Sequence, residues 1–127
     1  MKKLNKSHIL LLHQQLITEF RGAGGIRDDN LLDLSINAPY QTFDGKELYP
    51  TTIEKAVHLG FSIIKNHPFL DGNKRIGIHS MLVLLFLNDY SLDYTQEELI
   101  EIVMDIASSE KSDQDLLLWV IDHISKN

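Results

Sequence analysis

Residues 81–87 read MLVLLFL, an uninterrupted apolar run inside a segment with helical character that starts near Asn73. A helix that is apolar on nearly all sides needs other elements around it, because any face left in water would expose hydrocarbon. The run is about a third of the ~20 residues that a membrane-spanning helix requires. Residues 73–88 are therefore expected to form the central helix of a bundle, with no membrane partner.

The rest of the chain supplies start and stop signals for further helices. Apolar residues recur at helical spacing before the glycine run 22–25, and Pro39 ends a short second helix. Capping boxes, in which Thr is followed by Glu three residues later, open two other helices at Thr51 and Thr95, and Ser112 opens the last. The expected helices span about residues 5–21, 28–38, 51–65, 73–88, 95–108 and 112 onward.

One segment does not fit a helix. Residues 40–49 place an Asp-Gly pair between short β-prone pieces, which is typical of a small hairpin or an extended flap. The predicted fold class is all-α, a bundle of about six helices with one short flap or β-hairpin before the third helix. No linker or repeat divides the chain, so residues 1–127 are expected to form a single domain.

Composition excludes several classes of function. The formal net charge is −6, whereas proteins that bind nucleic acids directly need clustered Lys and Arg. The chain has no cysteine, which excludes disulfides and thiolate metal sites. The basic start is followed by a short amphipathic pattern, without the features of a signal peptide. A soluble, cytoplasmic protein is expected.

The polar stretch NHPFLDGNKRIG, residues 66–77, separates the two most apolar segments of the chain. Pro68 disfavours helical geometry at His67, so the third helix should end there. Gly72 allows a backbone conformation that other residues resist. Phe69 is expected to point inward and anchor the loop. This stretch is thus the loop between the third and fourth helices, together with the first turn of the fourth.

The first turn of the fourth helix has the features of an anion site. Backbone N–H groups at residues 72–75 should point outward from the helix start, where the helix dipole favours negative charge. Lys74 and Arg75 add two cations at the same end, although cations at this position disfavour the helix itself. A bound phosphate would explain why the sequence keeps both.

Two other residues of the stretch suggest catalysis. A neutral imidazole at His67 would accept the proton of an attacking hydroxyl, a role worth roughly 10²–10⁴ in rate. Asp71 would hold Mg²⁺ together with phosphate oxygens, or align the hydroxyl. Taken singly, either residue has an ordinary structural reading, a buried imidazole or a turn before a helix.

The nine residues HPFLDGNKR resemble the signature of the Fic/Doc family, whose Fic branch reads H-x-F-x-[D/E]-G-N-G-R-x-x-R. The upstream segments GIRDDNLL, TFDGKELYP and EKAVHLGFSIIKNHPF are similar to Doc (death-on-curing) toxins, so the resemblance covers nearly the whole chain. It implies an all-α Fic fold and the transfer of part of a nucleotide to a protein hydroxyl. The matching residues are His67, Phe69, Asp71, Gly72, Asn73 and Arg75.

Two departures from the Fic signature indicate the Doc branch. Lys74 replaces the third glycine, and Ile78 replaces the final arginine. The Doc branch carries the same lysine, and this resemblance implies that ATP binds with its γ-phosphate beside the histidine. The implied reaction is phosphorylation of a Ser or Thr hydroxyl, for which the family precedent is a threonine of elongation factor Tu, with arrest of translation.

The resemblance also implies a role for each matching position. His67 would be the general base, and Asp71 would orient the hydroxyl or bind Mg²⁺. Gly72 and Asn73 would shape a nest for the phosphates of ATP. Lys74 and Arg75 would neutralise the phosphate charge.

Two segments upstream of the signature have weaker implied roles. Thr42 and Phe43 in the flap would dock the target protein through backbone pairing, although an ordinary surface loop is an equal alternative. Arg27 would reach the nucleotide or form a salt bridge at a helix start. A separate antitoxin would restrain the protein, since the self-inhibitory pattern [S/T]-x-x-x-E-[G/N] is not found in this sequence.

The sequence leaves other functions open. A nucleotidyl (adenylyl) transferase that tolerates Lys74 is the nearest alternative, followed by a catalytically silent binding module with the same fold. A hydrolase or lyase acting on small phosphorylated molecules is a third. The remaining histidines lack the spacing of metal ligands and are expected to be structural or exposed: His8, His13, His58, His79 and His123.

Overall fold

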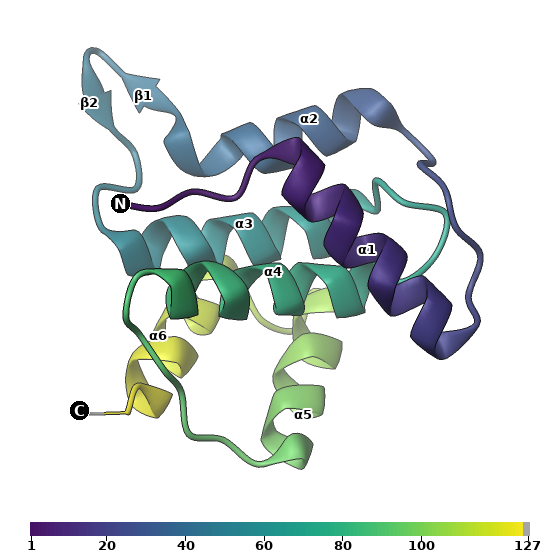
Figure 1. Cartoon of the computed structure of the whole chain (residues 1–127). Helices are drawn as coiled ribbons and strands as arrows, with labels where there is room; N and C mark the ends of the chain where they lie inside the picture. Colours follow the sequence, from purple (N-terminus) through teal and green to yellow (C-terminus); the bar gives the residue numbers. More distant parts are fainter. Residues whose placement is uncertain (126–127) are drawn as a thin grey trace.

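The computed structural model describes residues 1–125 and is an all-α bundle with one small hairpin, as predicted (Figure 1). α3 and α4 run antiparallel through the middle, α1 crosses one side of them, α2 covers a second side, and α5 and α6 lie below (Figure 1). The elements are α1 (Lys6–Phe20), α2 (Asp29–Asn37), η1 (Ala38–Tyr40), β1 (Thr42–Phe43), β2 (Lys46–Glu47), α3 (Thr52–Asn66), α4 (Asn73–Leu87), α5 (Gln96–Ala107) and α6 (Asp113–His123). No helix within residues 1–125 has the length and apolarity needed to cross a bilayer.

The α-helices within residues 1–125 have starts that are capped by side chains, with one exception. Asn5, Asp28, Thr51, Thr95 and Ser112 each accept a backbone hydrogen bond from the third residue of the helix that follows. Such caps satisfy N–H groups that have no partner inside the helix. α4 begins after Gly72 without a side-chain cap. Among the α-helices of residues 1–125, the one with an uncapped start is therefore the one that carries Lys74 and Arg75.

The two predicted capping boxes have different outcomes. At Thr95 the box is complete, because the Glu98 carboxylate accepts from the Thr95 N–H. At Thr51 it is half formed. The Thr51 hydroxyl accepts from the Glu54 N–H, but the Glu54 carboxylate turns to that hydroxyl, at 2.9 Å, and not to the Thr51 N–H.

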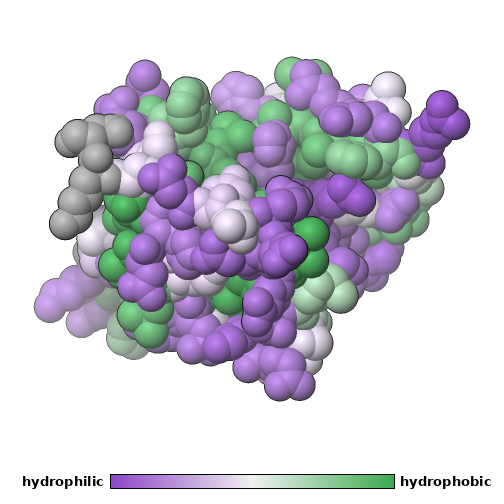
Figure 2. Space-filling view, turned by 90° about the horizontal axis from the view of Figure 1, so that it is seen from below, coloured by the Kyte–Doolittle hydropathy of each residue, from purple (hydrophilic) through white to green (hydrophobic). Residues whose placement is uncertain are grey.

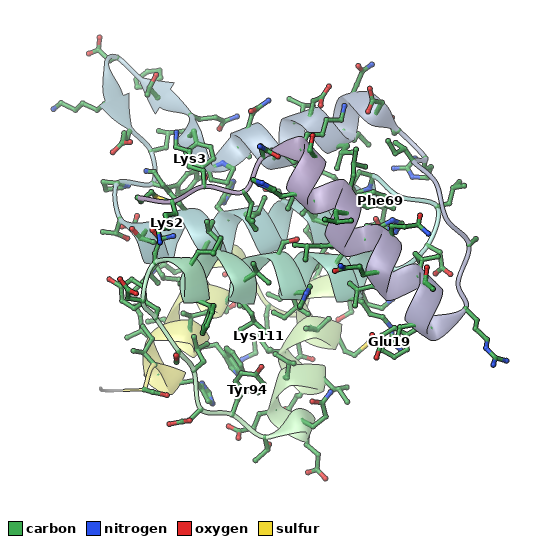
Figure 3. All side chains as sticks on the ribbon, in the orientation of Figure 1. Lys2, Lys3, Glu19, Phe69, Tyr94 and Lys111 are labelled. Carbon is green, nitrogen blue, oxygen red and sulfur yellow. The ribbon has the colours of Figure 1, made fainter. Side chains whose placement is uncertain are left out.

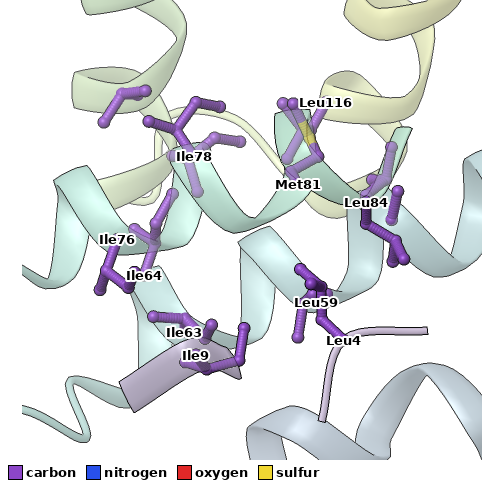
Figure 4. Packing of buried hydrophobic residues seen from close by; sticks show 14 of the residues in the cluster. Leu4, Ile9, Leu59, Ile63, Ile64, Ile76, Ile78, Met81, Leu84 and Leu116 are labelled. Carbon is purple, nitrogen blue, oxygen red and sulfur yellow. The ribbon is translucent and has the colours of Figure 1, made fainter. Parts of the chain in front are cut away.

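The hydrophobic core lies mainly between α3, α4 and the helices around them (Figure 4). α3 and α4 approach each other closely where Gly60 faces Gly77. A Cβ atom added to either glycine would lie 3.0 Å from the carbonyl oxygen of the other. The absence of side chains at both positions lets the two backbones pack directly.

α4 is central, but it is not covered on every side. Met81, Leu84 and Leu85 are fully buried, whereas Phe86 is 71% exposed and Leu87 is partly buried. The predicted central position of this helix is confirmed, and the side of α4 that carries Phe86 is left open because no helix among residues 1–125 covers it. Figure 2 shows the face that carries α5 and α6, where polar side chains separate small apolar areas.

The predicted hairpin is present and is anchored at its base. Its two strands pair antiparallel, and Asp44 and Gly45 form the turn with positive φ angles of 52° and 76°. Such angles at both turn residues match the twist of a two-residue hairpin. Lys55 of α3 is 5% exposed, and its ammonium group contacts the Tyr49 carbonyl and, at 3.3 Å, the Glu47 carboxylate.

An ion pair joins the start of α5 to the end of α6. His123 Nε2 donates to the Glu98 carboxylate at 2.7 Å, and Nδ1 donates to the Trp119 carbonyl at 2.6 Å. Both partners only accept, so the ring is doubly protonated and charged in this arrangement. The hydrogen bond to Glu98 raises the pKa of His123 above 6.5. Hydrogen bonds from His123 and then Thr95 lower the pKa of Glu98 from 4.5 to about 2.

This ion pair predicts a pH dependence of stability. A raised histidine pKa stabilises the fold fully below pH 6.5, and the contribution is lost as pH rises through the folded pKa. A lowered glutamate pKa stabilises above pH 4.5, and that contribution is lost as pH falls toward 2. We expect the pair to contribute most to the free energy of unfolding between pH 4.5 and pH 6.5. The melting temperature of the wild type should fall as the pH rises above 6.5. In His123→Gln this fall should be smaller, whereas His79→Gln should show the same dependence of melting temperature on pH as the wild type. The same pH dependence in all three proteins would contradict the pairing.

Candidate active site

His67 ends α3 in a left-handed conformation, with φ 48° and ψ 55°. This region is unfavourable for residues other than glycine and persists where neighbouring contacts fix it. The imidazole is exposed, and it makes no hydrogen bond, ion pair or ring stack with any other residue in 1–125. The structure thus leaves this side chain accessible to a substrate at the end of a well-ordered helix.

Arg27 holds the backbone on which His67 sits. Its Nε donates to the His67 carbonyl at 2.5 Å and its Nη2 to the Asn66 carbonyl at 2.9 Å. The backbone N–H groups of Arg27 and Asp28 both donate to the Pro68 carbonyl, at 2.8 and 3.0 Å. Arg27 therefore caps the C-terminal end of α3. The alternative of a salt bridge at a helix start is wrong, since no carboxylate pairs with Arg27 within residues 1–125, whereas a contact with the nucleotide stays a prediction.

We expect Arg27→Lys to loosen the backbone at His67, because one ammonium group cannot replace two diverging guanidinium contacts. The cost in stability should be about 1 kcal/mol, the usual net value of a hydrogen bond. Chemical denaturation would measure this cost, and an unchanged free energy of unfolding would show that the two contacts do not hold the end of α3.

Phe69 anchors the loop between α3 and α4, as predicted (Figure 3). It is 1% exposed, and its ring stacks on His13 of α1 with centroids 3.8 Å apart and planes at 12°. His13 is itself buried and donates from Nε2 to the Asp71 carbonyl at 2.8 Å. His13 was expected to be structural, but its link to this loop was missed. The repeat Ile9, His13, Ile17 on the buried face of α1 is the signal that places it inside.

Asn73 closes the loop from the other end. Its side-chain oxygen accepts from the Phe69 N–H at 2.9 Å, and its side-chain nitrogen donates to the Phe69 carbonyl at 3.0 Å. Gly72 just before it has φ 77°, a conformation that favours glycine. These two residues fix the shape of the loop through local contacts, and the Asn73 side chain is directed at the loop itself.

The Asp71 carboxylate lies between the loop and the glycine-rich segment after α1. One oxygen accepts from the Gly72 N–H at 2.8 Å and the other from the Ala23 N–H at 3.2 Å. The Gly72 N–H is thus occupied, which corrects the expectation that the N–H groups of residues 72–75 are all directed outward. The N–H groups of Asn73, Lys74 and Arg75 have no hydrogen-bond partner within residues 1–125.

Both cations of the first turn are exposed. Neither has a carboxylate within salt-bridge distance in the described part of the chain. The Arg75 guanidinium lies over the ring of Phe20 at 3.8 Å, a cation–π contact that fixes its direction. With three free N–H groups and the positive end of the helix dipole, Lys74 and Arg75 make this helix start suited to an anion such as phosphate.

A cavity of about 510 Å³ opens beside this helix start, between α1, α4 and α5. Phe20 lies on its α1 wall, Lys74, Arg75 and Ile78 on its α4 wall, and Ile100 and Met104 on its α5 wall. Its volume is in the range of small-molecule sites, about 300–1,000 Å³.

The described residues fit Mg²⁺ only at a site where a bound phosphate supplies some of the ligands. No three His, Cys, Asp or Glu side chains within residues 1–125 form a group that would hold a metal ion. Mg²⁺ often binds through one or two carboxylates and the phosphates of its substrate, keeping several waters. The exposed Asp71 carboxylate beside the anion site fits that pattern.

The structure does not bring Thr42 and Phe43 to this loop. The hairpin lies beyond the N-terminal end of α3, whereas His67 lies at its C-terminal end (Figure 1). At 1.5 Å per residue, a helix of this length separates its two ends by about 22 Å. Both residues are exposed, so they remain available to a large partner, but they do not lie beside the histidine.

The loop thus joins an exposed histidine at the end of α3 to an uncapped, positively charged start of α4. The comparison with known families agrees with this arrangement, because residues 3–85 match the model of the Fic/DOC family. The chain belongs to this family, which confirms the resemblance seen in the sequence. It is similar to Toxin Doc of Mycolicibacterium smegmatis (strain ATCC 700084 / mc(2)155), with 30% identity over 93 residues that cover 72% of each chain.

Proposed function

We propose that this protein is a Doc-like toxin of a toxin–antitoxin pair and that it transfers the γ-phosphate of ATP to a Ser or Thr hydroxyl of a target protein. The observation that carries the proposal is the exposed imidazole of His67 next to the uncapped start of α4. Membership of the Fic/DOC family and similarity to a protein named Toxin Doc support the toxin assignment.

The proposed reaction uses the residues of the loop as follows. The phosphates lie against the free N–H groups of residues 73–75, with Lys74 and Arg75 neutralising their charge. His67 accepts the proton of the target hydroxyl while the hydroxyl oxygen forms a bond to the γ-phosphorus. The bond between that phosphorus and the β–γ bridging oxygen breaks, and ADP leaves with the electron pair. Phosphoryl transfer depends mainly on such positioning and charge neutralisation.

Asp71 would hold Mg²⁺ together with the phosphates, and the ion would neutralise charge on the β- and γ-oxygens. The Asp71 carboxylate already lies next to the first turn of α4 through its contact with the Gly72 N–H. Its carbonyl is fixed by His13. The Gly72 and Ala23 N–H groups therefore hold the Asp71 side chain, and His13 holds its backbone.

Lys74 and Ile78 favour transfer of the γ-phosphate over transfer of the nucleotidyl group. In the Fic signature these positions are a glycine and an arginine. The lysine adds bulk and charge where the backbone would approach the phosphates. Ile78 is buried and apolar, so it offers nothing to the far end of a triphosphate.

The partners follow from the same family assignment. Elongation factor Tu is the proposed target, with arrest of translation as the consequence, and a separate antitoxin is the proposed inhibitor. The proposed location is the cytoplasm, where the target is found.

ATP labelled separately at the α- and γ-phosphates tests the proposal. Wild-type protein incubated with purified elongation factor Tu should transfer the γ-label to a Ser or Thr, and the intact mass of the target should rise by one phosphate. Transfer of the α-label would show a nucleotidyl transferase instead. Toxicity in cells without any labelled product would favour a binding module.

A further inference from the structure

We propose that the target segment carrying the acceptor hydroxyl docks on the exposed side of residues 25–27, where it meets the Leu70 side chain and the backbone of Ile26. This inference rests on the proposed function and deepens it, because it names the surface that presents the hydroxyl to His67 and the kind of segment that fits there. The partner is an extended stretch of the target protein with an apolar side chain close to its Ser or Thr.

Residues 25–27 run antiparallel to residues 68–70, the stretch that directly follows His67. The two stretches form an isolated antiparallel bridge. The Leu70 N–H donates to the Gly25 carbonyl at 3.1 Å. A segment that binds along this pairing therefore lies beside the histidine that accepts the hydroxyl proton.

Leu70 presents hydrocarbon on the outer side of this pairing. Its side chain is 59% exposed, whereas Phe69 before it is 1% exposed, as expected when successive residues of an extended segment point to opposite sides. Gly25, which lies opposite Leu70, has no side chain, and the Leu70 Cδ1 atom lies 3.1 Å from the position that a Gly25 Cβ would take. Leu70 thus reaches over Gly25 toward the outer edge of residues 25–27.

This outer edge carries backbone groups that a partner can use. In an antiparallel bridge, Gly25 and Arg27 direct hydrogen bonds to the opposite segment, while the groups of the residue between them point the other way. In agreement, the N–H and carbonyl of Ile26 make no hydrogen bond with any residue in 1–125, and Ile26 is 37% exposed. An extended peptide pairs with such groups when it adds to an exposed edge.

The neighbouring histidine determines which partner occupies this edge. Exposure alone does not distinguish Leu70, since single apolar side chains are common on protein surfaces. Leu70 lies three residues after His67, and the acceptor hydroxyl must come within hydrogen-bond reach of that imidazole. The residues flanking the hydroxyl then pass over the same loop. Thr42 and Phe43 lie at the other end of α3 and cannot hold this part of the target (Figure 1).

Leu70→Ala separates target docking from the other steps of transfer. With purified elongation factor Tu, the proposed target, the KM for the target should rise about five- to tenfold, because apolar contact is lost. The KM for ATP should match that of the wild type, since the phosphates are assigned to α4. Leu70→Met, which keeps a flexible apolar side chain of similar volume, should restore most of the target affinity. Leu118→Ala on α6 removes a leucine that is 52% exposed and should match the wild type in both constants.

Binding can also be measured without transfer. In a His67→Ala background, adding Leu70→Ala should raise the Kd for elongation factor Tu about five- to tenfold. A short synthetic peptide centred on the labelled Ser or Thr then tests the chemistry of the partner. Replacing one apolar neighbour of that residue by Ser should weaken binding to wild type but have little further effect on Leu70→Ala, because both changes remove the same contact. Methylation of the peptide nitrogen that pairs with Ile26 should weaken binding as well.

The possible failures are distinguishable. If the γ-label is transferred and Leu70→Ala keeps the wild-type KM for the target, only this inference is wrong. If Leu70→Ala weakens target binding but the wild type transfers no γ-label, the inference stands and the phosphotransferase assignment is wrong. An equal rise in the KM for ATP, or the same loss in Leu118→Ala, would also overturn the inference. Absence of both target binding and γ-label transfer would overturn both proposals.

Discussion

His67→Ala is expected to lower phosphoryl transfer by roughly 10²–10⁴, the usual contribution of a general base. The ring of His67 is exposed and makes no hydrogen bond, ion pair or stack within residues 1–125, so its removal should change the stability of the fold little. The KM for ATP should also change little, because the phosphates are assigned to α4. Single-turnover transfer of the γ-label to the target, measured beside thermal unfolding, would show both effects.

His79→Ala is the matched control for this variant. His79 lies on α4, and its ring likewise has no hydrogen bond, ion pair or stack among the described residues. It should retain wild-type transfer. Transfer by His67→Ala at the wild-type rate would remove the imidazole from the mechanism and leave the anion site without a proton acceptor.

Gly77→Val is expected to destabilise the protein by about 3 kcal/mol or more, because added groups at a closely packed helix crossing force both backbones apart. A Cβ atom at this position would lie 2.6 Å from the Ile64 side chain and 3.0 Å from the Gly60 carbonyl oxygen. For a chain of this size the melting temperature should fall by about 10 °C. Chemical denaturation and calorimetry would measure the change.

Gly24→Val provides the comparison. Gly24 is exposed, and the nearest atoms to a Cβ added there are 3.9 Å away, so the substitution fits without displacement. Its effect on the free energy of unfolding should stay within about 0.5 kcal/mol, as for most surface positions. If both variants melted alike, the close contact between α3 and α4 would not be a determinant of stability.

The fold was largely predictable from the sequence because its signals are local. Pro68 and the glycine run 22–25 ended helices where predicted, and Thr95 and Ser112 began them within about one residue. The Asp44–Gly45 turn likewise produced the hairpin. The exposure of single residues is not set by local signals, as at Phe86, where it depends on which helices cover α4.

The site was predictable in its residue types but not in its contacts. The spacing of His67, Asp71 and Arg75 indicated a loop with a proton acceptor and an anion site. It did not reveal that Arg27 caps α3, since that contact joins residues 40 positions apart. The burial of Lys55 was also missed, because its ammonium group reaches the Tyr49 carbonyl and the Glu47 carboxylate only when the base of the hairpin lies against the start of α3.

By itself, the sequence determined the helices, the hairpin turn, and the polar loop with its histidine and two cations, since caps, turns and apolar spacing act over a few residues. Only the tertiary structure decided that His13 supports the loop from α1 and that the Ala23 N–H after α1 holds the Asp71 carboxylate. It also decided that a cavity with one charged end adjoins the anion site. Each of these depends on how helices distant in the sequence pack together, and packing is set by the whole core.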